Sequence, residues 1–253
     1  MKASGIAAVI ERFAPASMAA EWDNSGFCIG SPDTEVRGVL VGFDCTPDLV
    51  KEAVRRGANM IVTHHPLIFR GIKKISDDTF LGSVITLAIK NDIVVYAAHT
   101  NADKAAGGVN DLMADRLGLV DRHPLCEDGF GLCGRLPRPM DSREFIAFVK
   151  EKFSLRIVRT SAPIEGPVEK VALCSGSGAG MLQDAVDSGA QAYLCGDLSY
   201  HQFFTEKGFM LLDVGHFESE IAIVDKLFSL LREKNSNFAV LRTEKDNNPI
   251  HYF

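Results

Sequence analysis

The sequence predicts an α/β fold made of two related halves with mixed, largely parallel sheets. Short apolar strands alternate with helices along most of the chain, which is typical of parallel sheets. The length of 253 residues allows one large domain or two small ones. A weak internal repeat favours two. We therefore expect one half over residues 1–125 and another over 126–253, with the closing helix free to pack back on the first.

The first half contains three apolar runs that predict strands. The expected strands cover residues 36–43, 58–62 and 93–97, and the expected helices cover 47–56 and 80–90. Pro47 in the first turn and Gly57 after the last turn are typical of helix ends. The second strand continues into Thr63-His64-His65-Pro66, and the third continues into His99.

The second half repeats this plan. The expected strands cover residues 168–174, 190–194 and 209–213, and the expected helices cover 181–187 and 217–232. Between the first strand and the first helix, residues 175–180 form a glycine-rich segment. Its backbone N–H groups could hold a phosphate, but we favour a tight turn.

Two shifts of the chain align polar residues of the halves. A shift of 132 positions places His64 and His65 on Gly196 and Asp197. A shift of 117 positions places His99 on His216, and Asp103 on Glu220. Any two strand–helix–strand units look somewhat alike, but we interpret the match as internal duplication. Both halves then deliver polar residues to strand ends, where open α/β sheets place their sites.

Composition and charge exclude several classes of protein. With 27 basic and 33 acidic side chains the net charge is −6, which disfavours nucleic acid as a partner. No apolar stretch reaches the ~18 residues of a membrane span, and the N-terminus does not read as a secretory signal. The six cysteines form no C-x-x-C pair, so we expect free buried thiols and a cytoplasmic protein.

Five of the seven histidines fall in four segments at strand ends. These histidines are His64, His65, His99, His201 and His216. Each segment has an ordinary interpretation, such as a turn at Asn101 or a helix cap at Asp197. Asp197 could instead orient a ligand histidine. Taken together, the imidazoles and carboxylates predict a metal centre in which two ions ~3.5–4 Å apart activate a shared water.

Four motifs carry a resemblance to a known family. They are THHPLIF from Thr63, HTNAD from His99, GDLSYHQ from Gly196 and DVGHFESE from Asp213. The chain resembles the Nif-three-like dinuclear metal proteins, often called GTP cyclohydrolase 1 type 2 homologues, in their compact form without a central insertion.

That resemblance implies a ligand set and an assembly. The implied ligands to two divalent ions per subunit are His64, His65, Asp103, His216 and Glu220. It also implies a metal site between the halves and a homohexameric ring. Imidazole and carboxylate ligands accept Zn, Fe, Mn, Co or Ni, so the residues do not select one metal.

Two functions fit these residues. The first is a metal-dependent hydrolase of a small substrate such as a nucleotide, cyclic amidine or phosphoester, with His99 and His201 moving protons or orienting the substrate. The second is a non-catalytic metal-binding or adaptor protein in metal handling or regulation. The cyclohydrolase activity follows from the family's label alone.

Overall fold

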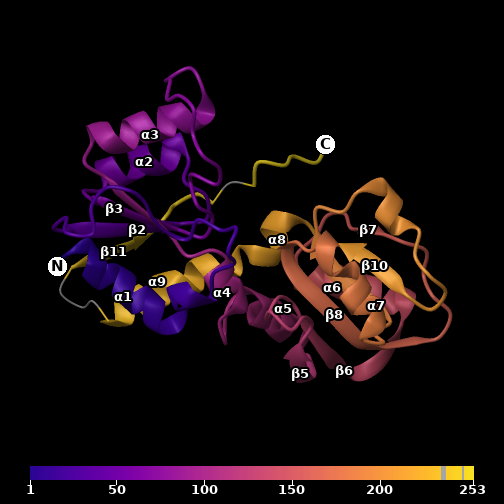
Figure 1. Ribbon diagram of the computed structural model, residues 1–253. Coiled ribbons are helices and arrows are strands. Elements are labelled where there is room, and N and C mark those ends of the chain that lie inside the picture. Colours follow the sequence, from indigo (N-terminus) through magenta and orange to yellow (C-terminus); the bar gives the residue numbers. More distant parts are fainter. Residues whose placement is uncertain (235–237, 247) are drawn as a thin grey trace. The chain divides into compact units, whose positions relative to one another are not determined.

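The computed structural model describes residues 1–234, 238–246 and 248–253 and divides the chain into two compact units. Unit 1 contains Met1–Ala105 and Ile223–Phe253, and unit 2 contains Ala106–Ala222. These bounds differ from the expected division at residue 125. The chain enters unit 2 earlier and then returns, because its last helix and last strand complete the layers of unit 1. Figure 1 follows this path by colour, with indigo and yellow segments together in unit 1.

Unit 1 is built on a sheet in the order β1-β4-β3-β2-β11. Its strands are β1 (Gly26–Ile29), β2 (Gly38–Gly42), β3 (Met60–Thr63), β4 (Val94–Ala97) and β11 (Ala239–Arg242). The strands β4, β3, β2 and β11 are parallel, and β1 pairs with β4 in the antiparallel sense. The three strands expected in this half are confirmed, with each end within two residues of the expected bound.

Helices cover both faces of this sheet. They are α1 (Ala3–Phe13), α2 (Pro47–Arg55), α3 (Phe80–Lys90), α4 (Thr100–Lys104) and α9 (Ala222–Lys234). In Figure 1, α2 and α3 lie on one side of the sheet and α1 and α9 on the other. Leu49 of α2 and Val84 of α3 pack with Leu40, Ile61 and Val95 of the strands. Thr46 caps α2 by accepting a hydrogen bond from Leu49 N, as expected for a helix start.

Unit 2 is built on a mixed sheet in the order β5-β6-β8-β9-β10-β7. Its strands are β5 (Val120–Pro124), β6 (Leu132–Asp141), β7 (Arg159–Thr160), β8 (Pro167–Ser177), β9 (Ala192–Gly196) and β10 (Met210–Asp213). Within this sheet, as far as the structure describes it, only β8, β9 and β10 run parallel to one another. The sheet is therefore less parallel than expected, because β5 and β6 add an antiparallel meander at one edge.

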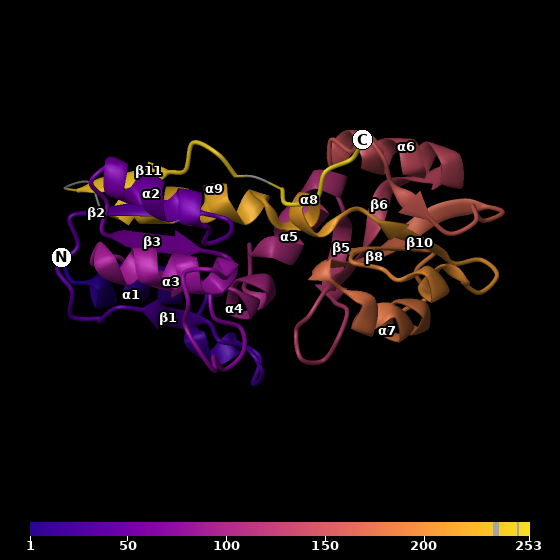
Figure 2. The ribbon, with the colours of Figure 1, turned by 90° about the horizontal axis from the view of Figure 1, so that it is seen from above.

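Two clusters of apolar side chains fill unit 2. Its helices are α5 (Val109–Leu117), α6 (Ser142–Lys152), α7 (Leu182–Asp187) and α8 (His216–Glu220). Phe145 of α6 packs with Leu194 in one cluster, and Ala185 of α7 packs with Tyr193 in the other. Since Tyr193 and Leu194 are neighbours on β9, α6 and α7 cover opposite faces of the sheet. Figure 2 shows α6 and α7 on either side of β8 and β10.

The expected helix over residues 217–232 is in fact two helices. The helix α8 begins at His216 and ends at Glu220, and α9 begins at Ala222. The chain passes from unit 2 to unit 1 at this point. The short helix α8 therefore belongs to the second unit, while α9 packs its buried residues Ile223, Leu227 and Leu231 within the first.

The two units share one strand plan. The order β1-β4-β3-β2 of unit 1 corresponds to β7-β10-β9-β8 of unit 2. In each case three consecutive strands are parallel, and the strand that precedes them in the chain pairs antiparallel with the last. This shared topology supports internal duplication. It places His99 after β4 and His216 after β10, at equivalent ends of the two sheets.

All six cysteines are free thiols, and four of them are buried. Burial raises the pKa of Cys45 and of Cys195 to about 12, so both stay protonated at neutral pH. These thiols act as small apolar side chains in the two cores. Across the described residues, no helix combines the length and apolar character required to cross a membrane.

We expect Leu227→Ala to lower the free energy of unfolding of unit 1 by about 2–5 kcal/mol, since Leu227 is fully buried in α9. Urea unfolding followed by the fluorescence of Trp22, the single tryptophan of the chain, reports on this unit. Ser229→Ala, on the exposed face of the same helix, is the control. An equal midpoint for both variants would show that α9 is not part of the core.

Candidate metal centre

Three histidines converge at one end of the unit 1 sheet. His64 and His65 follow β3, and His99 follows β4, its parallel neighbour. The ring centroids lie 4.9 Å apart for His64 and His65, 5.3 Å for His64 and His99, and 5.5 Å for His65 and His99. One nitrogen of each ring lies within 4.8 Å of the other two. Three imidazoles in this arrangement can hold a divalent transition-metal ion.

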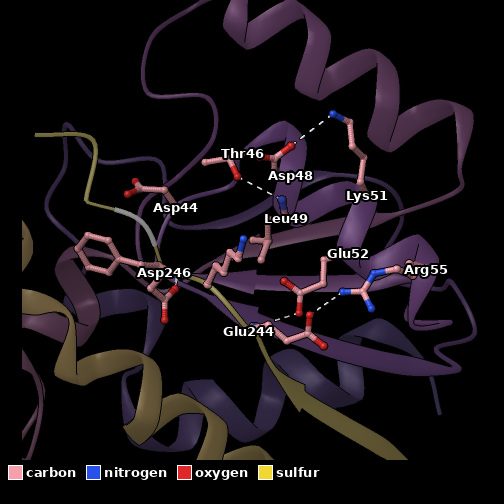
Figure 3. Close-up of a pocket in the computed structure, with 11 residues that line it drawn as sticks. Asp44, Thr46, Asp48, Leu49, Lys51, Glu52, Arg55, Glu244 and Asp246 are labelled. Carbon is pink, nitrogen blue, oxygen red and sulfur yellow. Dashed lines mark hydrogen bonds and ion pairs between the residues drawn. The ribbon is translucent and has the colours of Figure 1, made fainter. Parts of the chain in front are cut away.

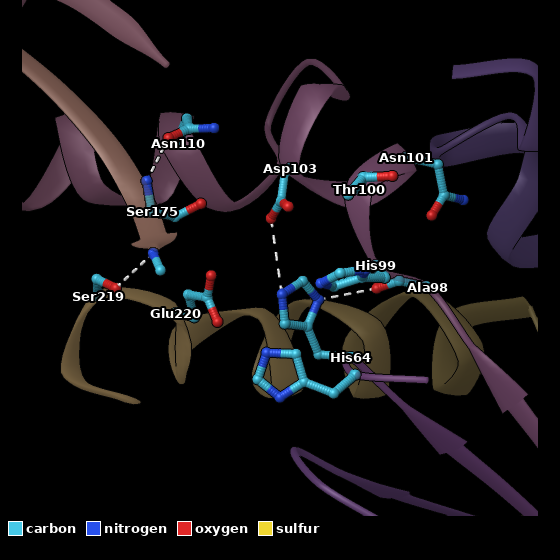
Figure 4. Close-up of polar contacts among 12 residues, drawn as sticks. His64, Ala98, His99, Thr100, Asn101, Asp103, Asn110, Ser175, Ser219 and Glu220 are labelled. Carbon is cyan, nitrogen blue, oxygen red and sulfur yellow. Dashed lines mark hydrogen bonds and ion pairs between the residues drawn. The ribbon is translucent and has the colours of Figure 1, made fainter. Parts of the chain in front are cut away.

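Each of these rings has its Nδ1 atom held by an oxygen. His64 Nδ1 lies 2.8 Å from the carbonyl oxygen of Ala98 (Figure 4). His65 Nδ1 lies 2.7 Å from Asp44 Oδ1, and His99 Nδ1 lies 2.7 Å from Asp23 Oδ1. Because these oxygens accept, they assign the proton to Nδ1 and leave the Nε2 lone pair for a metal. Ligand histidines in metal sites are held in this way.

Asp23 is the most strongly fixed of these acceptors. Its side chain is fully buried and also accepts hydrogen bonds from the hydroxyl groups of Ser25 and Thr100, both at 2.6 Å. Burial by itself would raise its pKa, but the hydrogen bonds from His99, Ser25 and Thr100 hold the pKa well below its usual range. Asp23 therefore carries a negative charge that fixes the ring of His99.

Asp103 brings a carboxylate to the same group. It lies on α4, one turn after His99, and its side chain is almost fully buried. Its Oδ1 atom is 3.6 Å from His64 Nε2, as Figure 4 shows. This distance is too long for a good hydrogen bond. It suits two ligand atoms that face a shared metal ion. The donor set of unit 1 thus fits a metal ion.

Phe43 holds His64 and His65 by backbone hydrogen bonds and a ring contact. Its carbonyl oxygen accepts from the backbone N–H of His64 at 3.1 Å and of His65 at 3.4 Å. Its ring stacks on His64 with a centroid separation of 5.8 Å. Its own N–H donates to Asp246 Oδ1 at 3.1 Å, which ties the C-terminal segment to this strand end. The backbone around both histidines is therefore fixed before any ligand binds.

A cavity of about 380 Å³ opens beside Asp44 (Figure 3). Its charged lining residues are Asp44, Asp48, Lys51, Glu52, Arg55, Glu244, Lys245 and Asp246. Arg55 pairs with Glu244 at 2.7 Å, so part of this lining is internally neutralised. Asp44 lines the cavity and also holds His65, which links the cavity to the histidine group.

In unit 2, a histidine and a glutamate form a further pair of candidate metal ligands. His216 starts α8, and its Nε2 atom lies 3.0 Å from Oε2 of the buried Glu220. Its Nδ1 atom lies 2.7 Å from Asp197 Oδ2. Asp197 follows β9 and orients His216, while Ser199 caps the short helix that comes next. Of the two interpretations of Asp197, the geometry thus favours orientation of a ligand histidine.

Glycines make room for this pair. A Cβ atom on Gly176 would lie 2.2 Å from Glu220 Oε1 and 3.2 Å from His216 Cε1. A Cβ atom on Gly196 would lie 2.7 Å from the backbone nitrogen of His216. The glycine-rich segment is only partly the expected turn: residues 175–177 end β8, Ala179–Met181 form a 3-10 helix, and Gly178 N donates to Gly176 O at 3.0 Å between them. Gly176 N also donates at 3.0 Å to Oγ of Ser219, the residue before Glu220.

The residues expected at the site are thus distributed over both units. His64, His65, His99 and Asp103 lie together in unit 1, and His216 and Glu220 lie together in unit 2. His201 is exposed on the short helix Tyr200–Phe203, where its ring contacts Tyr200 and Phe204. The individual roles of these residues stay predictions.

Sequence reasoning missed Asp23 and Asp44. Asp44 directly follows the strand expected over residues 36–43, so the strand-end rule could have found it. Asp23 lies in a loop before β1, far in sequence from His99, and no local pattern marks it. Its role comes only from the hydrogen bond across 76 residues.

Comparisons with known proteins agree on one family. A family model for Duf34/NIF3 (NGG1p interacting factor 3) matches residues 1–249. A Clostridium perfringens protein called GTP cyclohydrolase 1 type 2 homolog is 35% identical over 257 residues, covering 97% of this chain and 98% of that protein. A Streptococcus pneumoniae protein of the same name is 33% identical and covers 100% of both.

Solved structures share the fold. A Bacillus cereus protein related to NIF3 has a TM-score of 0.92 and 25% identity, covering 100% of this chain and 99% of that one. A Staphylococcus aureus protein has a TM-score of 0.90 and 27% identity, with the same coverage. The mixed α/β architecture is therefore that of NIF3-related proteins.

We expect Gly176→Ala to displace the Glu220 carboxylate from His216, because the added Cβ atom would lie 2.2 Å from Glu220 Oε1. Its φ of +57° should also cost about 1–2 kcal/mol of stability. Gly189→Ala is a matched control, since Gly189 has a φ of +74° and open space around it. Circular dichroism measures the stability, and NMR of the imidazole nitrogens reports on His216. Identical His216 signals in both variants would contradict the assigned role of Gly176.

Proposed function

The chain belongs to the Duf34/NIF3 family, and on this premise we propose that it is a metal-dependent hydrolase of a small substrate. The observation that carries the proposal is the set of four histidines, His64, His65, His99 and His216, whose Nδ1 atoms are all held by oxygens. Such bonds fix the tautomer and ring orientation that a metal ligand requires. Histidines that served only packing would not all need an oxygen acceptor at Nδ1.

We propose that these ligands bind two divalent metal ions per chain. The ligands would be His64, His65 and Asp103 of unit 1 and His216 and Glu220 of unit 2. Zn, Fe, Mn, Co or Ni would suit these nitrogen and oxygen donors. When bound, two such ions supply Lewis acidity and an activated water. The internal duplication supports this proposal, since it relates His99 to His216 and Asp103 to Glu220.

The protein residues would contribute orientation and proton transfer. Asp44, Asp23 and Asp197 would keep the Nε2 atoms of their histidines aimed at the ions. Asp103 would bind metal beside His64 Nε2. His99 lies among the other histidines, so it could act as a further ligand or could orient the substrate. The substrate would be small, with a nucleotide or phosphorylated compound as candidates.

Metal content tests the ligand set. We expect protein purified without added metal to hold about two divalent ions per chain by elemental analysis, and His65→Ala and Glu220→Ala to hold fewer. Asp197→Asn should lower metal affinity by roughly 10–100-fold, because His216 loses its charged acceptor. His123→Ala and Asp187→Asn, both on the exposed surface, are the controls. Wild-type protein without divalent metal would contradict the proposal.

Turnover tests the hydrolase. Metal-loaded protein screened against nucleotides, cyclic amidines and phosphoesters should release product faster than the double variant His65→Ala, Glu220→Ala. The expected difference is at least ~100-fold, since the metal ions supply the nucleophile. If the loaded protein shows no turnover above this variant, the family's metal site serves binding alone. The non-catalytic adaptor function would then replace the hydrolase.

A further inference from the structure

Two large aromatic side chains stand exposed beside the histidine group. Trp22 is 60% exposed and Phe69 is 47% exposed. Both rings meet His99 edge-on, with centroid separations of 6.3 Å for Trp22 and 5.7 Å for Phe69. They also contact one another at 5.9 Å with an angle of 44° between their planes. The ring of His99 thus contacts this aromatic pair and also the rings of His64 and His65.

The loop that carries Trp22 is held in place by hydrogen bonds. Ala20 N donates to Thr100 Oγ1 at 2.9 Å, and Thr100 Oγ1 donates to Asp23 Oδ2 at 2.6 Å, so the loop is tied to α4. Asn24 Nδ2 donates to the carbonyl oxygen of Ile68 at 2.6 Å, which ties it to the segment of Phe69. The two rings are therefore positioned before a ligand arrives, and binding would lose little conformational entropy.

The setting of the pair favours a small flat ligand. Charged and exposed residues, Glu21 and Arg70, flank the two rings in the chain. Charged side chains are depleted in the core of protein interfaces, so these neighbours favour a small ligand over a protein partner. An aromatic face of this size suits one planar ring, because stacked or edge-on aromatic contacts are favourable.

We propose that Trp22 and Phe69 form a platform that selects a planar aromatic or heteroaromatic substrate. The ring of the substrate would rest on this platform, and an oxygen or nitrogen donor attached to the ring would reach past His99 toward the metal ligands. This inference rests on the proposed metal site and adds the substrate class. It makes Trp22 and Phe69 specificity-determining residues that do not hold metal.

Three hydroxamic acids test this platform, because they bind metal through one common group. Benzohydroxamate carries a planar ring, cyclohexanecarbohydroxamate a puckered ring of similar size, and acetohydroxamate no ring. By calorimetry on metal-loaded protein, we expect benzohydroxamate to bind about 10-fold, or about 1.4 kcal/mol, tighter than the cyclohexane compound. Trp22→Leu and Phe69→Leu should each reduce this preference to within about 2-fold, with metal content and acetohydroxamate affinity unchanged.

Phe80→Leu is the matched control, since Phe80 is 64% exposed in the same unit. It should keep the preference for the planar ring. Trp22 is the single tryptophan, so benzohydroxamate should also change its fluorescence while acetohydroxamate does not. Equal binding of both ring compounds to wild-type protein, or a preference that survives in Trp22→Leu and Phe69→Leu, would overturn the platform. A change of mass by light scattering in these variants would also overturn it and assign the rings to a contact between copies.

Failure of the proposed function gives a different result. If the protein held no metal, acetohydroxamate would not bind, and the ligand assignments would fall. Caffeine, a planar heteroaromatic ring without a strong metal-binding group, still probes the platform in that case. Saturable quenching of Trp22 by caffeine that weakens at least about 5-fold in Phe69→Leu would support it. Absence of such quenching would overturn it.

Discussion

Hydrogen bonds from Nδ1 to a fixed oxygen are the interaction on which this site depends. A histidine side chain can rotate and can exchange its proton between two nitrogens, so a ring without such a bond presents no defined donor. Asp23, Asp44 and Asp197 and the carbonyl of Ala98 remove both freedoms. Asp23 does so from full burial, where its charge is stabilised by Ser25 and Thr100. The metal-binding proposal follows from this network more than from the number of histidines.

The two units bring their polar residues together by the same arrangement of parallel strands. In each, three parallel strands end at a common edge, and the residues after the second and third strands supply the polar groups. Parallel strands bring such residues together although they are distant in sequence, which is why open α/β folds place sites there. The differences lie at the outer edges, where β11 extends the first sheet and the β5 and β6 meander extends the second. Those edges do not supply the donors.

Local patterns predicted most elements but not the way the chain is shared between units. Apolar runs gave β2, β3, β4, β8, β9 and β10, because a buried strand requires them at close spacing. The expected boundary at residue 125 differs from the observed units, since no local signal marks where the chain returns to unit 1. The same limit applies to α8 and α9, whose helical periodicity runs on through Ile221 while the chain passes between units. Gly176 read only as part of a turn, and its clearance for Glu220 emerges from packing.

The sequence by itself determined the α/β class and the types of side chain that can bind metal, because these depend on short spacings and residue chemistry, and it indicated the internal duplication. Tertiary structure decided which groups meet. It placed His99 with His64 and His65, paired Asp23 with a histidine 76 residues away, and set Trp22 and Phe69 against the same ring. Such contacts join segments that no periodicity relates, so only the folded chain can specify them.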